Sequence, residues 1–268
     1  MITDLLLRLN PKARRGSKPR CHLLTHGSPE KVSARLTQLI TPWGQVDTSD
    51  KWMPQGFINS QEAQLGKADI FLDSVTGQSL VNWWLAVPGG ARVPNWDIAS
   101  TCTLEDKPGL LLIEAKAHDE ELNYEKAGKK RERNETMGQM QNREQIRKRM
   151  QEANAGFANS TQLEWALSIE HHYQMSNRFA WTWKLTELGI PIVLIYLGFL
   201  NAIEMSDRGV PLCNHTVWEQ LVLSHSEPLF SNQVWNKRWT LHGQPFIPLI
   251  KSIEQPLNIE AKEADDED

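Results

Sequence analysis

The feature that most constrains the fold is the stretch from Pro94 to His118, whose pattern is typical of a β-hairpin. Its first half, Trp96 to Leu104, is rich in β-branched and apolar residues, and Leu110 to Ala115 is a short apolar run. Between them, residues 105–109 (EDKPG) are turn-forming. The stretch therefore predicts two antiparallel strands, of which the second should be buried.

Three charged residues interrupt this apolar hairpin. Asp97 lies at the start of the first strand, and Glu114 and Lys116 lie at the end of the second. Because side chains alternate along a strand, Glu114 and Lys116 share a face, and Asp97 can reach that face across the ladder. Two converging carboxylates can bind a hard divalent cation such as Mg²⁺. A neighbouring lysine can orient or deprotonate a metal-bound water, or stabilise negative charge on a phosphoryl oxygen.

This combination suits attack of water on a phosphodiester. The alternative is a turn aspartate beside a solvated pair of Glu114 and Lys116, because short motifs of this kind are common. The position of the pair after an apolar run favours the metal centre over that alternative.

Residues 94–97 (PNWD) and 114–116 (EAK) resemble the signature of the PD-(D/E)XK nuclease superfamily, the restriction-endonuclease-like fold. In this chain Asn95 and Trp96 separate the proline from the aspartate. The segments NWDIASTC, LLLIEAKAH and HYQMSNRFAW also look like a bacterial family of such proteins without an assigned substrate. The resemblance implies an α/β domain in which a helix, three strands, a second helix and a fourth strand build a mixed central sheet flanked by helices.

The same resemblance implies roles for the charged residues. Asp97 and Glu114 would bind Mg²⁺, with Mn²⁺ as a substitute, and the carbonyl of Ala115 would be a third ligand. Lys116 would activate water.

A helix is expected after the hairpin, from a capping box at residues 161–164 to Gly189. Gln174 and Arg178 are spaced to share one face of it. The resemblance implies a glutamine or a basic residue beside the metal on this helix, so Gln174 is a catalytic candidate. Arg178 and Asn177 are candidate nucleic-acid contacts, and a structural hydrogen bond is the alternative for each.

Two further segments flank this helix. Residues 119–160 are densely charged and predict a helical insertion, with a lid beside the active site as the alternative. Ile190 to Leu200 predicts the fourth strand, buried on both faces. The most apolar segment, Ile190 to Ile203, is shorter than the ~20 residues of a membrane span, so no membrane association is expected.

The net charge of −4 is unevenly distributed along the 268 residues. The end of the chain, from Glu260 to Asp268, holds six acidic residues and one lysine, which leaves the remainder close to neutral. Residues 1–20 hold six basic residues, among them Arg14 and Arg15, which could contact phosphates without reading sequence or could simply be solvated. The expected organisation is a basic arm at 1–24, a nuclease-like domain at 25–258 and a disordered acidic tail at 259–268.

The three cysteines are an odd number with no CxxC spacing, which favours a reducing cytoplasm. The resulting prediction is a cytoplasmic, metal-dependent nuclease that acts on nucleic acid, with DNA favoured over RNA as the substrate. A homodimer or a protein partner stays open. The alternatives are a catalytically silent nucleic-acid-binding or scaffold module on the same fold, and another two-carboxylate hydrolase, such as a glycosidase using Asp97 and Glu114 as acid and base.

Overall fold

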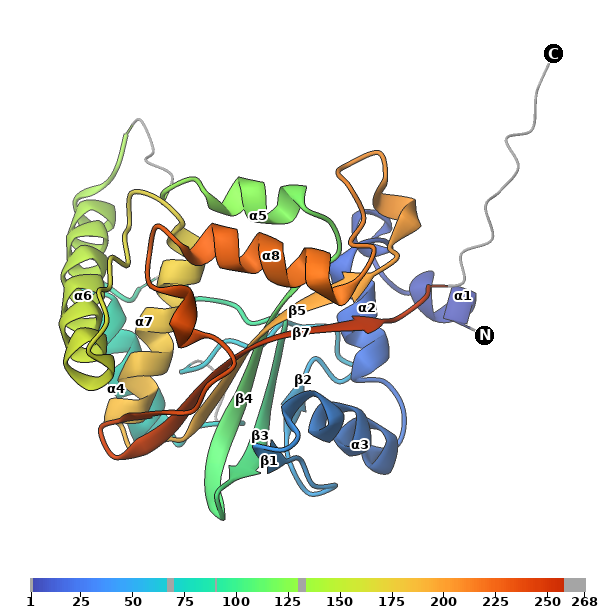
Figure 1. Cartoon of the computed structure of the whole chain (residues 1–268), viewed down its shortest axis with the longest axis horizontal. Coiled ribbons are helices and arrows are strands. Elements are labelled where there is room, and N and C mark those ends of the chain that lie inside the picture. The colour runs from blue at the N-terminus through green and yellow to red at the C-terminus, as the bar shows by residue number, and fades with distance from the viewer. Residues whose placement is uncertain (1, 67–69, 90, 130–133, 258–268) are drawn as a thin grey trace.

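The chain folds around one mixed β-sheet with helices on both faces (Figure 1), as seen in a computed structural model. The structure describes residues 2–66, 70–89, 91–129 and 134–257. The strands are β1 (Gly44–Gln45), β2 (Trp52–Met53), β3 (Ile98–Leu104), β4 (Lys107–Lys116), β5 (Ile192–Leu200), β6 (Trp239–Leu241) and β7 (Gln244–Glu254). The helices are α1 (Ile2–Leu6), α2 (Ser17–Leu24), α3 (Pro29–Ile40), α4 (Ser74–Trp84), α5 (Glu120–Glu125), α6 (Met137–Thr161), α7 (Tyr173–Glu187) and α8 (His215–Ser226).

The predicted hairpin is confirmed by β3 and β4, which pair antiparallel with Ile98 opposite Ile113. Its turn is tighter than the pattern predicts. Only Glu105 and Asp106 are unpaired, both with positive φ, and residues 107–109 belong to β4. Two such residues make a turn whose twist matches that of the flanking strands.

The sheet continues from β4 to β5 and then to β7, both in parallel pairing, and β6 closes that edge. At the other edge β1 and β2 pair with different parts of β3, so together they occupy one strand position. Residues of β5 alternate between two hydrophobic clusters, which confirms the prediction of a strand buried on both faces. The α/β class and the mixed sheet are therefore established.

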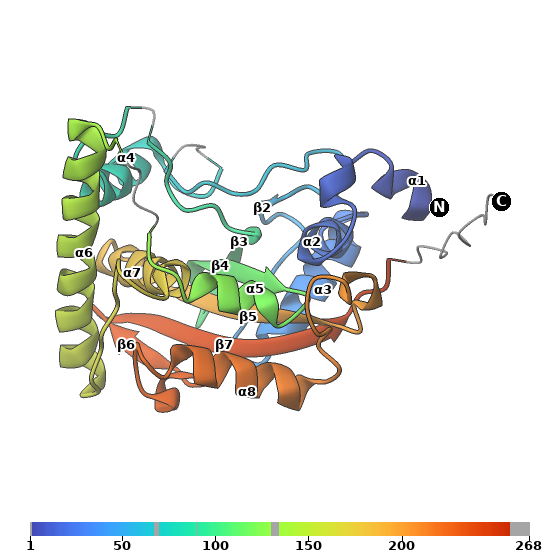
Figure 2. The ribbon, with the colours of Figure 1, turned by 90° about the horizontal axis from the view of Figure 1, so that it is seen from above.

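Each face of the sheet has its own set of helices (Figure 2). One hydrophobic cluster joins the sheet to α4, α6, α7 and α8, with Leu80, Ile146, Phe179 and Trp218 as buried members. The other joins it to α2 and α3. The described part of the chain has no helix that is long and apolar enough to cross a membrane.

The predicted capping box at residues 161–164 is wrong, because α6 ends at Thr161 and α7 begins only at Tyr173. The linking segment instead places alternate residues against the core, from Leu163 to Ile169. That period of two is typical of extended chain rather than helix. The capping box that does form joins Thr136 and Gln139 at the start of α6.

Residues 2–24, predicted as a basic arm, form α1, a short 3-10 helix and α2. Cys21 and Leu24 belong to the core, and Arg20 is buried against Glu204. The charged segment at 119–160 contains α5 and α6, and α6 buries Ile146 against the core. The acidic tail at 259–268 lies outside the described residues.

Candidate functional site

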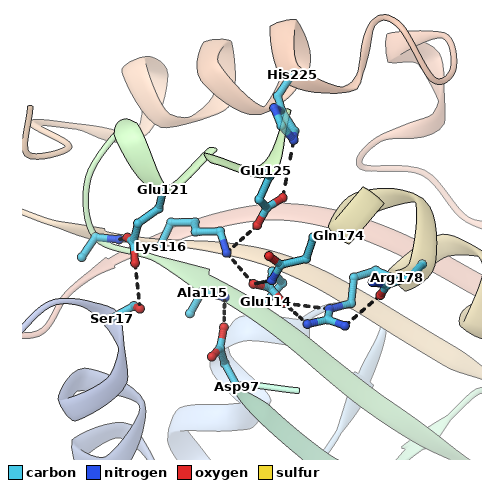
Figure 3. Close-up of polar contacts among 12 residues, drawn as sticks. Ser17, Asp97, Glu114, Ala115, Lys116, Glu121, Glu125, Gln174, Arg178 and His225 are labelled. Atoms are coloured by element: carbon cyan, nitrogen blue, oxygen red, sulfur yellow. Dashed lines mark hydrogen bonds and ion pairs between the residues drawn. The ribbon is translucent and has the colours of Figure 1, made fainter. Parts of the chain in front are cut away.

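The charged residues of the hairpin meet where β4 ends (Figure 3). Asp97 directly precedes β3, and its Oδ2 atom accepts a hydrogen bond of 2.8 Å from the backbone N–H of Ala115. The first paired residue of β3 is Ile98, so the side chain of Asp97 supplies an acceptor where the β3–β4 ladder stops. This contact anchors the half-buried carboxylate of Asp97 beside the last residue pair of β3 and β4.

Glu114 lies at the centre of the site and is 2% exposed. Its Oε1 atom accepts hydrogen bonds from Lys116 and Gln174, and its Oε2 atom accepts from the Nε and Nη2 atoms of Arg178, each at 2.7 Å. The prediction that Glu114 and Lys116 share a face is confirmed by their contact. A carboxylate has about four acceptor positions, so all of those on Glu114 are used.

Lys116 connects Glu114 to a second buried acid. Its Nζ atom lies 2.6 Å from Oε1 of Glu125, which comes from α5. Burial by itself would lower the pKa of Lys116, but Glu114 and Glu125 outweigh it and raise the pKa well above its ordinary value. Lys116 is therefore a fixed cation, which can orient a water or a phosphoryl oxygen but is poorly suited to deprotonating water.

A histidine lies behind this ion pair. The Nε2 atom of His225 is 3.5 Å from Oε2 of Glu125, and His225 is 3% exposed. Its helix, α8, approaches the sheet closely because Gly198 has no side chain: a Cβ there would lie 2.6 Å from the Trp218 ring. His225 follows Trp218 by two turns, so this close packing brings it to Glu125.

The predicted shared face of α7 is confirmed, since Gln174 and Arg178 both contact Glu114. The Arg178 guanidinium also lies 4.7 Å from the centroid of the Trp96 ring, and its Nη1 atom donates to Oδ1 of Asn177 at 2.9 Å. Arg178 and Asn177 are each only 5% exposed. Here Arg178 holds the carboxylate of Glu114 and Asn177 holds Arg178, so neither side chain points into solvent, where nucleic acid would bind.

The basic residues of the N-terminal segment are also engaged within the protein. Arg14 donates to the carbonyls of Leu7 and Leu9, and Arg15 forms an ion pair with Asp207. Neither joins the cluster around Glu114. Because Arg15 stays partly exposed, with 37% of its side chain accessible, it keeps a surface from which a phosphate could be contacted.

Three carboxylates share this site with two permanent cations of the described residues. Asp97, Glu114 and Glu125 face Lys116 and Arg178, and His225 lies beside Glu125. Burial and the neighbouring Glu114 raise the pKa of Asp97 to about 8, although Lys116 acts in the opposite direction. The negative charge on Asp97 is therefore disfavoured in this environment, and a bound cation would stabilise it.

Two more carboxylates contact residues next to the hairpin's charged cluster, and the sequence pattern did not identify them. Glu121 accepts from the backbone N–H groups of Ala117 and His118 and from the hydroxyl of Ser17. Glu62 accepts from Lys18 at 2.8 Å and from Asn95 at 2.9 Å.

Of the site residues that the sequence pattern did not identify, only some follow a recognisable spacing in the sequence. Glu121 and Glu125 lie four residues apart just after Lys116, a spacing that places both on one face of a helix. Glu62 and His225 are far from the hairpin in the chain, and no local pattern connects them to it.

The oxygen atoms at the end of β4 decide whether a divalent cation fits there. Within the described ranges, no group of three or more His, Cys, Asp or Glu side chains is arranged to hold a metal ion. Asp97 retains one carboxylate oxygen that accepts no hydrogen bond from the described residues. The carbonyl of Ala115 points to the same side of β4 as the N–H of Ala115, which donates a hydrogen bond to Asp97. Glu114 could join them after one of its donors leaves, so the residues fit a cation with one rearrangement.

No protein-family model, curated protein or solved structure matches the chain. The function of the chain has to be inferred from the chemistry of these residues.

Proposed function

We propose that this protein is a metal-dependent phosphodiesterase that cleaves nucleic acid, with DNA favoured over RNA. The observation that carries the proposal is the cluster at the end of β4. Asp97 and Glu114 reach it from neighbouring strands, Lys116 is held there as a cation, and a bound cation would stabilise the negative charge that Asp97 otherwise gains only at raised pH. Hard carboxylate oxygens are the ligands that Mg²⁺ or Mn²⁺ prefers.

The order of elements supports the same proposal. Helix α3 is followed by the strand position shared by β1 and β2, then by β3 and β4, helix α7, and β5 parallel to β4. The PD-(D/E)XK resemblance implies this order of helix, three strands, helix and strand, with α5 and α6 as an insertion before α7.

Each residue has a proposed task. Asp97, Glu114 and the carbonyl of Ala115 would hold the cation, which when bound lowers the pKa of a water and stabilises charge on a phosphoryl oxygen. Lys116 has a third N–H beyond those facing Glu114 and Glu125, and that N–H would donate to the attacking water or to the phosphate. Gln174 and Arg178 position Glu114.

The decisive experiment is incubation of the purified protein with single- and double-stranded DNA and RNA, with and without Mg²⁺ or Mn²⁺. Cleavage is expected only with a divalent cation, and it should be lost in Asp97→Asn. An asparagine oxygen can still accept from the N–H of Ala115, so this variant should stay folded. Equal cleavage by the variant, or cleavage in EDTA, would sink the proposal.

A second candidate is a nucleic-acid-binding module without turnover. The observation in its favour is Glu114, whose acceptor positions are all used and which a cation can reach only by displacing a donor. Binding of DNA or RNA without cleavage, together with no heat of Mg²⁺ binding in calorimetry, would favour this module.

A further inference from the structure

A cavity of about 810 Å³ lies between the chain segment that follows α4 and the N-terminal part of α6. Figure 2 shows α4 and α6 side by side in this part of the molecule. Its lining includes the apolar residues Leu85, Val87 and Ile146 and the basic residues Arg92 and Lys129. A volume of several hundred Å³ with both apolar and polar walls is typical of small-molecule sites.

Buried polar contacts fix the walls of the cavity. The amide of Asn142 on α6 bonds both backbone groups of Val87: Oδ1 accepts from the N–H at 2.7 Å, and Nδ2 donates to the carbonyl at 2.9 Å. On the opposite side, Arg143 pairs with Glu135 at 2.7 Å and donates to the carbonyl of Lys129 at 3.2 Å. Since both walls are tied to α6, the cavity is pre-formed.

Two basic side chains of the cavity, Lys129 and Arg92, form no ion pair with another described residue. The ammonium of Lys129 is 3.3 Å from the hydroxyl of Tyr173 and 4.9 Å from the centroid of its ring, and no carboxylate among the described residues forms an ion pair with it. Burial and the neighbouring Arg143 lower the pKa of Lys129, and the charge of Glu135 acts in the opposite direction. Arg92 is exposed at the rim and likewise has no ion pair within the described residues. An anion bound here would meet Lys129 and Arg92, while Glu135 on the same wall is already paired with Arg143.

Both sides of the cavity lead to the site at the end of β4. Tyr173, which Lys129 contacts, directly precedes Gln174, and Gln174 donates to Glu114. On the other side, the segment that carries Arg92 continues to Asp97 five residues later. The walls of the cavity are therefore joined through the chain to the residues that would hold a scissile phosphate.

We propose that the cavity binds one nucleotide unit of a nucleic-acid strand next to the bond that is cleaved. Lys129 and Arg92 contact its phosphate, and the wall formed by Leu85, Val87 and Ile146 packs against its base. This inference rests on the proposed function for the identity of the strand, but it assigns a binding task to residues outside the metal site. Phosphate contacts by Lys and Arg are the main source of affinity for nucleic acids. Packing of a side chain against a base depends little on which base it is.

The test measures binding separately from chemistry. A fluorescein-labelled single-stranded DNA oligonucleotide is titrated with the full chain in EDTA, at several salt concentrations, and fluorescence anisotropy is recorded. Lys129→Met and Arg92→Met should each weaken binding and lower the slope of log affinity against log salt by about 0.7, because each removes one phosphate contact. Lys129→Arg should restore most of the affinity, since it keeps the charge.

Lys148→Met is the matched control, because Lys148 is exposed on α6 and does not line the cavity. It should leave the affinity unchanged, and far-ultraviolet circular dichroism should show that all variants are folded. An unchanged salt slope in both Lys129→Met and Arg92→Met, or no oligonucleotide binding by the wild type, contradicts the subsite. If binding depends on Lys129 but the protein cleaves nothing in Mg²⁺, the nuclease proposal alone is contradicted. If the protein cleaves and both variants bind as wild type does, the subsite alone is contradicted.

Discussion

The ammonium nitrogen of Lys116 lies 2.6 Å from Oε1 of Glu125, and both side chains are buried. The two residues are nine positions apart and come from different elements, β4 and α5. Lys116 therefore bridges two carboxylates, Glu114 in its own strand and Glu125 above it. The lysine of the E-x-K motif is thus fixed in position and charge by a residue outside the motif.

Glu125→Gln tests this bridge. The amide cannot offset the charge of Lys116, so the free energy of unfolding, measured with denaturant, should drop by about 3 kcal/mol. This is the lower end for breaking a buried ion pair, because Glu114 still pairs with Lys116. Turnover should fall about 10²-fold, because Lys116 is no longer held where it donates to the attacking water or the phosphate, while calorimetric Mg²⁺ affinity should stay the same. Glu120→Gln on the same helix is the control and should behave as wild type. A turnover unchanged in Glu125→Gln would show that the bridge is structural only.

Arg178→Met tests whether Glu114 is a metal ligand. Removing the guanidinium leaves Glu114 a buried carboxylate with two donors fewer, so the free energy of unfolding should drop by about 3–5 kcal/mol. The same change frees Oε2 of Glu114. If Glu114 binds the cation, MgCl₂ should therefore raise the Tm of the variant by more than it raises that of wild type. Arg147→Met, which removes a partly exposed ion pair, is the control. Equal shifts in Tm for all three proteins would argue against Glu114 as a ligand.

Gly198→Ala tests the packing of α8. A methyl group at residue 198 would lie 2.6 Å from the ring of Trp218, so the helix would have to move away from β5. Overpacking of this kind typically costs about 1–3 kcal/mol, which denaturant unfolding would measure. Gly89→Ala is the control, because a methyl group there meets nothing within 4 Å. A stability equal to that of wild type would mean that α8 approaches β5 less closely than described.

His22 predicts a pH dependence of stability. Burial, with Lys18 in addition, lowers the pKa of His22 to about 4 from its ordinary 6.5. Between those two values the unfolded chain binds a proton that the folded chain does not, so stability falls as the pH decreases from 6.5 to about 4. Below that window both states are protonated and the contribution no longer changes.

His22→Phe should remove this contribution while keeping a ring against Phe57. The Tm of wild type should therefore drop more steeply across the window than that of the variant. Other groups, such as His172 with its lowered pKa and Asp97 with its raised one, are present in both proteins, so the difference isolates His22. His215→Phe at an exposed position is the control. Parallel curves for wild type and His22→Phe would contradict the prediction.

The amino-acid sequence is sufficient to show which side of its own helix or strand each central residue occupies. Alternation along β4 placed Glu114 and Lys116 on one face, and helical spacing placed Gln174 and Arg178 together. These are local relationships, set by the repeat of a strand or a helix within a few residues. The start of α7 was missed because the alternating residues from Leu163 onward favour extended chain over helix.

The residues that those faces contact follow from the packing of the whole domain. It brought Glu125 and His225 to Lys116, saturated Glu114 with donors and placed Arg178 inside instead of on a phosphate-binding surface. Such contacts join elements that are distant in the chain, and they depend on how closely helices pack on the sheet. The approach of α8 at Gly198 is one example. Interior packing is dense and specific, so the partner of a buried charge is set by the whole core and by no local repeat.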